Sequence, residues 1–189
     1  MTKTVHQLKV TLRDVRPPVW RRIVVRSETR LDELAAVLEA AMGWEGYHLH
    51  QYWVGRTTRY CMPDPDWGTE GDRDERRFRL GEVLPAAGKR MTWEYDFGDG
   101  WEHDVVAEAI DPADPGVDYP VCIKGRRACP PEDCGGPWGY GNLLEALADP
   151  DHPNHDDLTE WAPIDFDPAR FDVDETTEAM RSLRPLAGW

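Results

Sequence analysis

A period-two alternation of apolar and polar residues, broken once by glycines, is the feature that most limits the folds open to this sequence. Residues 91–97 alternate in this way, and residues 101–110 continue the pattern. Such alternation places one face of a β-strand on a core and the other face in water. Between the two runs, Gly98-Asp99-Gly100 offers the positive-φ positions that a tight turn requires. The sequence therefore predicts an antiparallel hairpin over residues 91–110.

The residues before this hairpin predict two more strands and a helix. Residues 5–12 and 19–26 each alternate at period two, and the Pro17-Pro18 pair between them cannot donate to a β-ladder. Apolar residues then recur at helical spacing over residues 30–42, and Gly43 suits the left-handed position that follows a helix. We therefore expect a long N-terminal helix at residues 30–42.

Regular patterning weakens after this helix and again after the hairpin. Residues 56–77 are polar and interrupted by prolines and glycines, which predicts a long surface loop. Residues 111–141 are richer still in proline and glycine, which predicts an ordered but irregular stretch. Helical spacing returns in three C-terminal segments: residues 142–148, residues 153–161 and a last helix that opens at Asp167 or Asp174.

These segments together predict an α+β fold. Its hairpins form a mainly antiparallel sheet, accompanied by the long N-terminal helix and a helical C-terminal part. The length of 189 residues suits a single domain over residues 1–189, and we find no internal repeat.

The charge of the chain limits its partners. The sequence contains 36 acidic and 22 basic side chains, a formal net charge of −14, so it disfavours non-specific binding to nucleic acid. It has neither an apolar run of membrane-spanning length nor the apolar core of a signal peptide, so we expect a cytoplasmic protein with no membrane partner.

Several classes of enzyme lack their residues in this sequence. Ser27 and Ser182 are the only serines, and neither lies in a known nucleophile motif. Neither a phosphate-binding loop nor a dinucleotide-binding glycine fingerprint occurs. Serine hydrolases, kinases and nicotinamide-dependent dehydrogenases are therefore poor interpretations.

The cysteines allow a metal site without requiring one. Cys122, Cys129 and Cys134 are clustered, but their spacing differs from the paired knuckles of zinc ribbons. A three-thiolate zinc site would take its fourth ligand from one of three histidines: His103, His152 or His155. Buried thiols in a glycine-rich loop are the favoured alternative, so no cofactor is required and zinc remains a hypothesis.

Two further groups of residues could bind a cation. The hairpin turn gathers Asp96, Asp99, Glu102 and His103, which suit a divalent ion or acid–base catalysis. Solvated charges at a turn that needs Asp for backbone reasons are the favoured explanation. Strand alternation places Asp96 on the face opposite the aromatic residues.

His48 and His50 form the second group. They lie two residues apart on a strand expected at residues 47–54, so both side chains should point the same way. The sequence identifies no third ligand near them, and a core or surface position is the simpler explanation.

The arginines near the N-terminus have two interpretations. This basic set could contact phosphates from a strand surface, or pair with the acidic remainder of the chain, which the net charge favours. The set comprises Arg13, Arg16, Arg21, Arg22, Arg26 and Arg30.

Four segments together resemble one known family. They are PPVWRRI (17–23), AMGW (41–44) with HLH (48–50), YDFGDGWEH (95–103) and RACPPEDCGGPWGY (127–140). The combination resembles the plasmid pRiA4b ORF-3-like family over residues 4–175. The resemblance implies a single α+β domain and a link to mobile genetic elements, and it implies no defined biochemical activity.

We therefore hypothesise a non-enzymatic binding or accessory protein, with an unidentified protein or small molecule as its partner. It would use an aromatic, acidic groove formed where the Gly98–Trp101 turn meets the Cys129–Tyr140 loop. A metal-dependent, hydrolase-like enzyme is the alternative, and a nucleic-acid accessory factor is a further one. The groove candidates are Trp44, His48, His50, Asp96, Asp99, Trp101, Glu102, His103, Glu132, Asp133, Trp138 and Tyr140.

Overall fold

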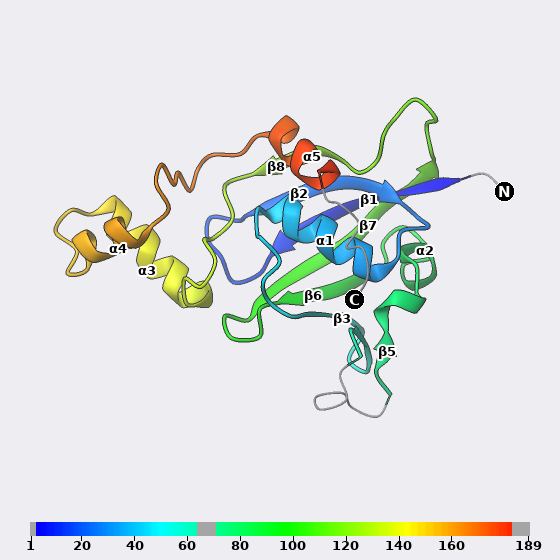
Figure 1. The fold of residues 1–189 in the computed structure, drawn as a ribbon, viewed down its shortest axis with the longest axis horizontal. Helices are drawn as coiled ribbons and strands as arrows, with labels where there is room; N and C mark the ends of the chain where they lie inside the picture. Colours follow the sequence, from blue (N-terminus) through cyan, green and yellow to red (C-terminus); the bar gives the residue numbers. More distant parts are fainter. Residues whose placement is uncertain (1–2, 64–70, 183–189) are drawn as a thin grey trace.

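Eight strands form one sheet in the part of the chain that the computed structural model describes, residues 3–63 and 71–182. Their order is β5-β4-β3-β6-β7-β1-β2-β8, and neighbours are antiparallel except for the parallel pair β4 and β5 (Figure 1). The strands are β1 (Thr4–Leu12), β2 (Trp20–Arg26), β3 (His50–Val54), β4 (Thr58–Cys61), β5 (Arg73–Asp74), β6 (Arg90–Tyr95), β7 (Trp101–Pro112) and β8 (Val121–Arg126). The predicted α+β class is confirmed.

The helices occupy two places relative to this sheet. Helices α1 and α5 contact each other and lie over the same face, whereas α3 and α4 pack together beyond the ends of the strands (Figure 1). The helices are α1 (Leu31–Met42), α2 (Leu80–Val83), α3 (Gly136–Ala148), α4 (His155–Trp161) and α5 (Val173–Arg181), with a 3-10 turn η1 (Glu75–Arg77). No helix within the described ranges is long and apolar enough to cross a membrane.

Alternation along the strands decides which face of the sheet meets the helices. Leu8 and Val10 of β1, Ile23 of β2, Trp93 of β6 and Val105 of β7 are all fully buried. Their sequence neighbours on these strands point to the opposite face and are half-buried or exposed. The predicted hairpin is confirmed, with Tyr95 and Trp101 paired at its closed end.

The opposite face of the sheet carries ion pairs between strands. Arg22 of β2 binds Glu108 of β7 through two hydrogen bonds of 2.5 and 2.9 Å. Arg13, just after β1, pairs with both Glu102 and Asp104 of β7. Arg22 reaches Glu108 across β1, which lies between β2 and β7. Cross-strand pairs of opposite charge stabilise a sheet modestly. These two arginines therefore show the internal pairing that the net charge favoured.

Helix α1 forms where its apolar spacing predicted it. Leu31, Leu34 and Leu38 face the core, and Gly43 ends the helix with a left-handed φ of 97°. It is nevertheless not a long N-terminal helix: it has 12 residues and follows two strands, so the first element of the fold is β1.

Three other local expectations were wrong. The loop expected at residues 56–77 contains β4, β5 and η1, because β4 pairs with β3 and β5 pairs with β4, which extends the sheet there. The irregular stretch at residues 111–141 contains β8, which gains its partner only from β2. Helix α3 begins six residues before the expected residue 142, with a proline in its first turn, a position that proline favours.

Candidate metal centre

Three loops meet beyond one end of the strands. We call this region the three-loop junction, and it comprises residues 43–49, 96–100 and 127–135. Gly135 N–H donates to Asp99 Oδ2 at 3.1 Å, which joins the second loop to the third. Trp44 Nε1–H donates to the Pro130 carbonyl at 3.0 Å, which joins the first loop to the third. The hairpin turn and the cysteine-containing loop therefore lie side by side, as predicted.

The contact between these loops requires a glycine. Gly136 has a φ of 67°, and a Cβ added there would stand 2.4 Å from the backbone carbonyl oxygen of Asp99. Real Cβ atoms essentially never approach a backbone oxygen so closely. A side chain at this position would force the hairpin turn and the start of α3 apart, so the glycine is needed for the junction to close.

A histidine and two aspartates from the three loops converge at the centre of the junction. One ligand atom from each of His48, Asp96 and Asp133 can be chosen so that all lie within 4.8 Å of one another. His48 Nε2 lies 3.3 Å from Asp133 Oδ1, and His48 Nδ1 lies 3.7 Å from Asp96 Oδ1. Two ligands of a tetrahedral zinc ion stand about 3.4 Å apart when the bonds are about 2.1 Å long. The Nε2–Oδ1 spacing thus matches that of two ligands on one ion.

Glu132 places a fourth candidate ligand beside this group. Its Oε1 accepts hydrogen bonds from the Tyr95 hydroxyl and from the Glu45 backbone N–H, both at 3.0 Å. Its Oε2 lies 3.9 Å from His48 Nε2. Burial, followed by the hydrogen bond to Glu132, raises the pKa of Tyr95, so its hydroxyl remains a proton donor to this carboxylate.

Two atoms at this point are buried without a hydrogen bond. His48 Nε2 and Glu132 Oε2 are both shielded from solvent, and neither has a hydrogen-bond partner among the described residues. Leaving a buried polar atom unpaired costs about 1–3 kcal/mol. The two atoms face each other across a gap that a cation could bridge, and one bound ion would satisfy both.

The two aspartates have backbone conformations that most side chains avoid. Asp96 and Asp133 both have a φ of 55°. Aspartate tolerates this left-handed region better than most residues. The alternation of β6 ends at Tyr95, and Asp96 turns inward, where its Oδ1 accepts from Gly98 N–H at 2.9 Å. The expectation that Asp96 continues the alternation on the face opposite the aromatic residues was therefore wrong.

His50 belongs to a different cluster from His48. Its Nε2 lies 3.0 Å from Oε2 of the fully buried Glu75, and its Nδ1 lies 3.6 Å from Glu39. Burial alone would lower the pKa of His50, but the hydrogen bond to Glu75 and the nearby carboxylates outweigh it and raise the pKa. Strand β3 begins only at His50, so the two histidines do not share one strand face as expected.

Most aromatic groove candidates pack in the core instead of lining an open surface. Trp44, Trp101 and Tyr140 are buried, and Trp44 stacks on Tyr95 with ring centroids 4.8 Å apart. Trp138 is the exception, with 91% of its surface exposed. Other large apolar side chains are exposed within the junction loops: Tyr47, Leu49 and Phe97.

The four residues proposed for a metal-dependent enzyme do not converge. Glu102 pairs with Arg13 on the outer face of the sheet, and Asp99 accepts from Gly135 N–H. His103 is fully buried beside Trp93, with ring centroids 4.6 Å apart, and burial lowers its pKa to about 3. Of this quartet, only Asp96 belongs to the ligand group at the junction.

The clustered cysteines also form no ligand group within residues 3–63 and 71–182. Cys122 Sγ contacts the Lys124 carbonyl, and burial raises the pKa of Cys129 and raises that of Cys134 to about 12. The proposed fourth ligands belong to no ligand group among the described residues either. Nδ1 of each contacts the backbone: His103 with Trp93, His152 with Asn154, and His155 with Ala146.

The fold and this junction define a class of protein: an α+β protein whose mostly antiparallel sheet ends in a histidine–carboxylate junction. The chain belongs to the plasmid pRiA4b ORF-3-like protein family, which it matches over residues 4–175.

The chain has relatives in a bacterium and an archaeon. The uncharacterized protein y4hQ of Sinorhizobium fredii (strain NBRC 101917 / NGR234) is 42% identical over 185 residues, which cover 97% of this chain and 94% of that protein. The crystal structure of MM3350, a protein of unknown function from Methanosarcina mazei Go1, superposes with a TM-score of 0.84 at 34% identity. That comparison covers 93% of this chain and 98% of the archaeal one.

Sequence reasoning identified the four candidate ligands at the junction only as members of a longer candidate set. His48, Asp96, Glu132 and Asp133 come from three distant segments, and no spacing rule relates them. The clearest signal in the sequence is an acidic pair held between two prolines and a cysteine followed by two glycines, at residues 130–136. The buried carboxylates of the His50 cluster were missed, because they follow no motif.

Proposed function

We propose that this protein is a non-enzymatic binding protein that holds a divalent cation at the three-loop junction. His48, Asp96, Glu132 and Asp133 would supply the ligands. The observation that supports this most directly is the pair of unpartnered buried atoms, His48 Nε2 and Glu132 Oε2, which face each other at 3.9 Å. A mixed set of imidazole and carboxylate ligands suits Zn²⁺ or Mn²⁺.

The ion would hold the three loops together. Each loop contributes at least one ligand, and three of the four ligands are carboxylates that repel one another in the absence of a cation. A bound cation would remove this repulsion and tie the loop after α1 to the hairpin turn and to the loop before α3.

The ion would also face a binding partner. The Asp133 side chain is mostly exposed, and Tyr47, Leu49, Phe97 and Trp138 present large apolar groups to solvent around the junction. Exposed aromatic residues beside a charged centre are typical of binding surfaces. This surface, rather than an open groove, is the aromatic and acidic region that we propose binds a protein or a small molecule.

Two wider parts of the proposal rest on other observations. A role beside mobile genetic elements is supported by the plasmid reading frame that gives the family its name. A cytoplasmic location is supported by the four cysteines, all of which are free thiols.

Calorimetric titration of tag-free, EDTA-treated protein with Zn²⁺ and with Mn²⁺ tests the cation site. We expect one ion per chain for the wild type, and at least about tenfold weaker binding for His48→Gln and Asp133→Asn. Asparagine accepts the left-handed backbone at residue 133, so that variant should fold.

Asp151→Asn, which changes an exposed acid in the loop before α4, is the matched control and should bind like the wild type. The proposal fails if folded wild-type protein binds neither ion saturably. It also fails if both junction variants keep wild-type affinity.

A further inference from the structure

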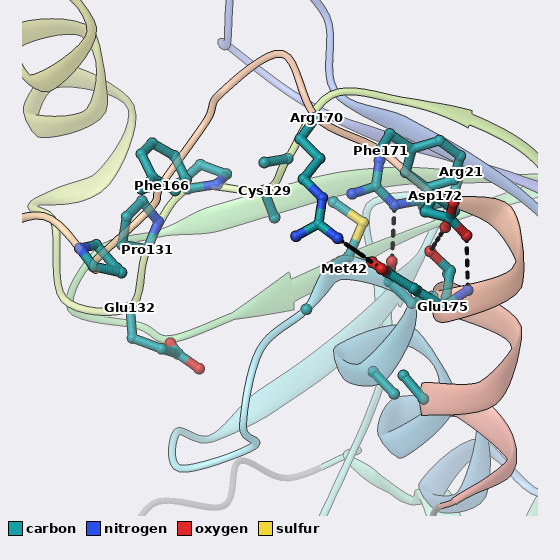
Figure 2. Close-up of a pocket in the computed structure, with 18 residues that line it drawn as sticks. Arg21, Met42, Cys129, Pro131, Glu132, Phe166, Arg170, Phe171, Asp172 and Glu175 are labelled. Carbon is teal, nitrogen blue, oxygen red and sulfur yellow. Dashed lines mark hydrogen bonds and ion pairs between the residues drawn. The ribbon is translucent and has the colours of Figure 1, made fainter. Parts of the chain in front are cut away.

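A cavity adjoins the three-loop junction and shares Glu132 with it, but its binding residue is a different one. Its volume is about 360 Å³, and it lies between the C-terminal end of α1, the loop before α3 and the first turns of α5 (Figure 2). This volume is at the lower end of the range for small-molecule sites. Most of the lining is apolar, including Met42, Pro131, Phe166, Phe171 and Ala179.

Arg21 is the unusual residue in the wall of this cavity. It is only 3% exposed, and among the described residues it has no carboxylate partner. Its Nε donates to the Ala41 carbonyl at 2.8 Å, and its Nη1 donates to the carbonyls of Trp20 and Arg126. Its Nη2 makes no hydrogen bond to the described residues, although a guanidinium has five N–H donors.

Each of the other charged side chains around the cavity has at least one partner of its own. Arg170 donates to Glu175, with distances of 2.6 and 2.9 Å to its two carboxylate oxygens. Asp172 accepts from the backbone N–H groups of residues 174 and 175 and caps α5. Glu132 is bound through Oε1 at the junction. Arg21 is therefore the cation in this wall without an anion, and burial lowers its pKa.

A buried cation without a counter-charge is costly unless something pairs with it. The Phe171 ring lies 4.4 Å from the guanidinium carbon, which stabilises the charge in part and fixes the plane of the side chain. An arginine held in this way presents its remaining N–H donors in a fixed direction, as carboxylate recognition requires.

We propose that this cavity binds a small monocarboxylate with an apolar body, whose carboxylate pairs with Arg21 and whose body contacts the apolar wall. A single free arginine matches a single negative charge. The acidic side chains of Glu132, Asp172 and Glu175 around the cavity would repel a doubly charged phosphate. The lining therefore favours a carboxylate over a phosphate.

Ligand-observed NMR titrations with benzoate, 3-phenylpropionate and isovalerate test the proposal, with benzamide as the neutral analogue of benzoate and inorganic phosphate as the competing anion. We expect at least one of the acids to bind saturably, and benzamide to bind at least about tenfold more weakly than benzoate. Ala179→Leu should abolish binding because it fills the cavity from α5. Arg21→Gln should weaken it about 10–100-fold.

Arg181→Gln is the matched control for both variants. Arg181 lies on α5, as Ala179 does, but it donates to backbone carbonyls outside the cavity. Should Arg21→Gln fail to fold, Ala179→Leu still decides the question. The proposal is overturned by any of four results: no saturable binding of the acids, equal binding of benzamide and benzoate, tighter binding of phosphate, or unchanged binding by Ala179→Leu.

Discussion

At the scale of single residues, the junction depends on backbone conformations that few side chains adopt. Asp96 and Asp133 have left-handed φ values, and Gly136 combines one with close contact to the Asp99 carbonyl. Such positions cost free energy locally and persist only where surrounding contacts hold them, which is common at functional sites. Two of the four candidate ligands, Asp96 and Asp133, therefore occupy backbone positions that restrict which residues can replace them.

Gly136→Ala should destabilise the protein by at least about 2 kcal/mol, because the new Cβ meets a backbone oxygen and the left-handed φ disfavours alanine. Urea denaturation measures the change. Gly141→Ala, in the same helix, is the control: nothing lies within 4 Å of its added Cβ, and alanine should stabilise α3 by about 0.5–1 kcal/mol there. Equal effects of the two substitutions would contradict the close-contact argument.

At the scale of elements, helix α5 links the core to the cavity. It packs on α1 and β8, buries Met180 and forms one wall of the carboxylate site that we propose. Its sequence is mostly polar, so its position depends on its cap and on these few contacts. Asp172 provides the cap by accepting from the N–H groups of Asp174 and Glu175, at 2.8 and 2.9 Å.

Asp172→Ala should lower the free energy of unfolding by about 1 kcal/mol, because two backbone donors lose their acceptor. Asp172→Asn should retain most of the stability, since asparagine caps nearly as well. Thermal unfolding measures the global change, and amide hydrogen exchange should show faster exchange in α5. Unchanged exchange in α5 for the alanine variant would count against the capping role.

At the scale of the whole molecule, buried imidazoles link folding to pH. Burial lowers the pKa of His103 to about 3 and also lowers that of His6. The folded protein therefore binds fewer protons than the unfolded chain below pH about 6.5. The contribution of these two neutral imidazoles to the free energy of unfolding is fully present above pH 6.5 and is lost as the pH falls toward 3. The pKa of His50 is raised, so its contribution to the free energy of unfolding has the opposite pH dependence: it is present below pH 6.5 and is lost as the pH rises above that value.

The free energy of unfolding should fall by on the order of 4 kcal/mol through His103 alone between pH 6.5 and 3. Its Nδ1 contacts the Trp93 carbonyl, and an asparagine amide can replace that donor, so His103→Asn should remove this part of the slope. Urea denaturation at a series of pH values measures it. His152→Asn, outside the core, should leave the slope unchanged, and an unchanged slope in His103→Asn would contradict the assignment.

The hairpin, the first two strands and α1 could all be predicted because each is specified by its own sequence. Alternation and helical spacing act over neighbouring residues, and Gly43 ends α1 through its own φ preference. Strands β4, β5 and β8 could not be predicted, because their residues become strands only through hydrogen bonds to partners elsewhere in the chain. Burial of single side chains shows the same dependence on the fold. Trp138 and Trp101 are both tryptophans, yet the first is exposed and the second is buried.

The sequence by itself determined the α+β class, the faces of the main strands and the segments that carry chemistry, since these follow from local periodicity and turn preference. Only the tertiary structure decided which of those residues meet. It brought His48, Asp96, Glu132 and Asp133 together from three loops, kept His50 and His103 apart from them, and left Arg21 beside a cavity without a carboxylate partner. Distances between side chains remote in sequence depend on how the whole sheet and its loops pack, and no local pattern encodes that packing.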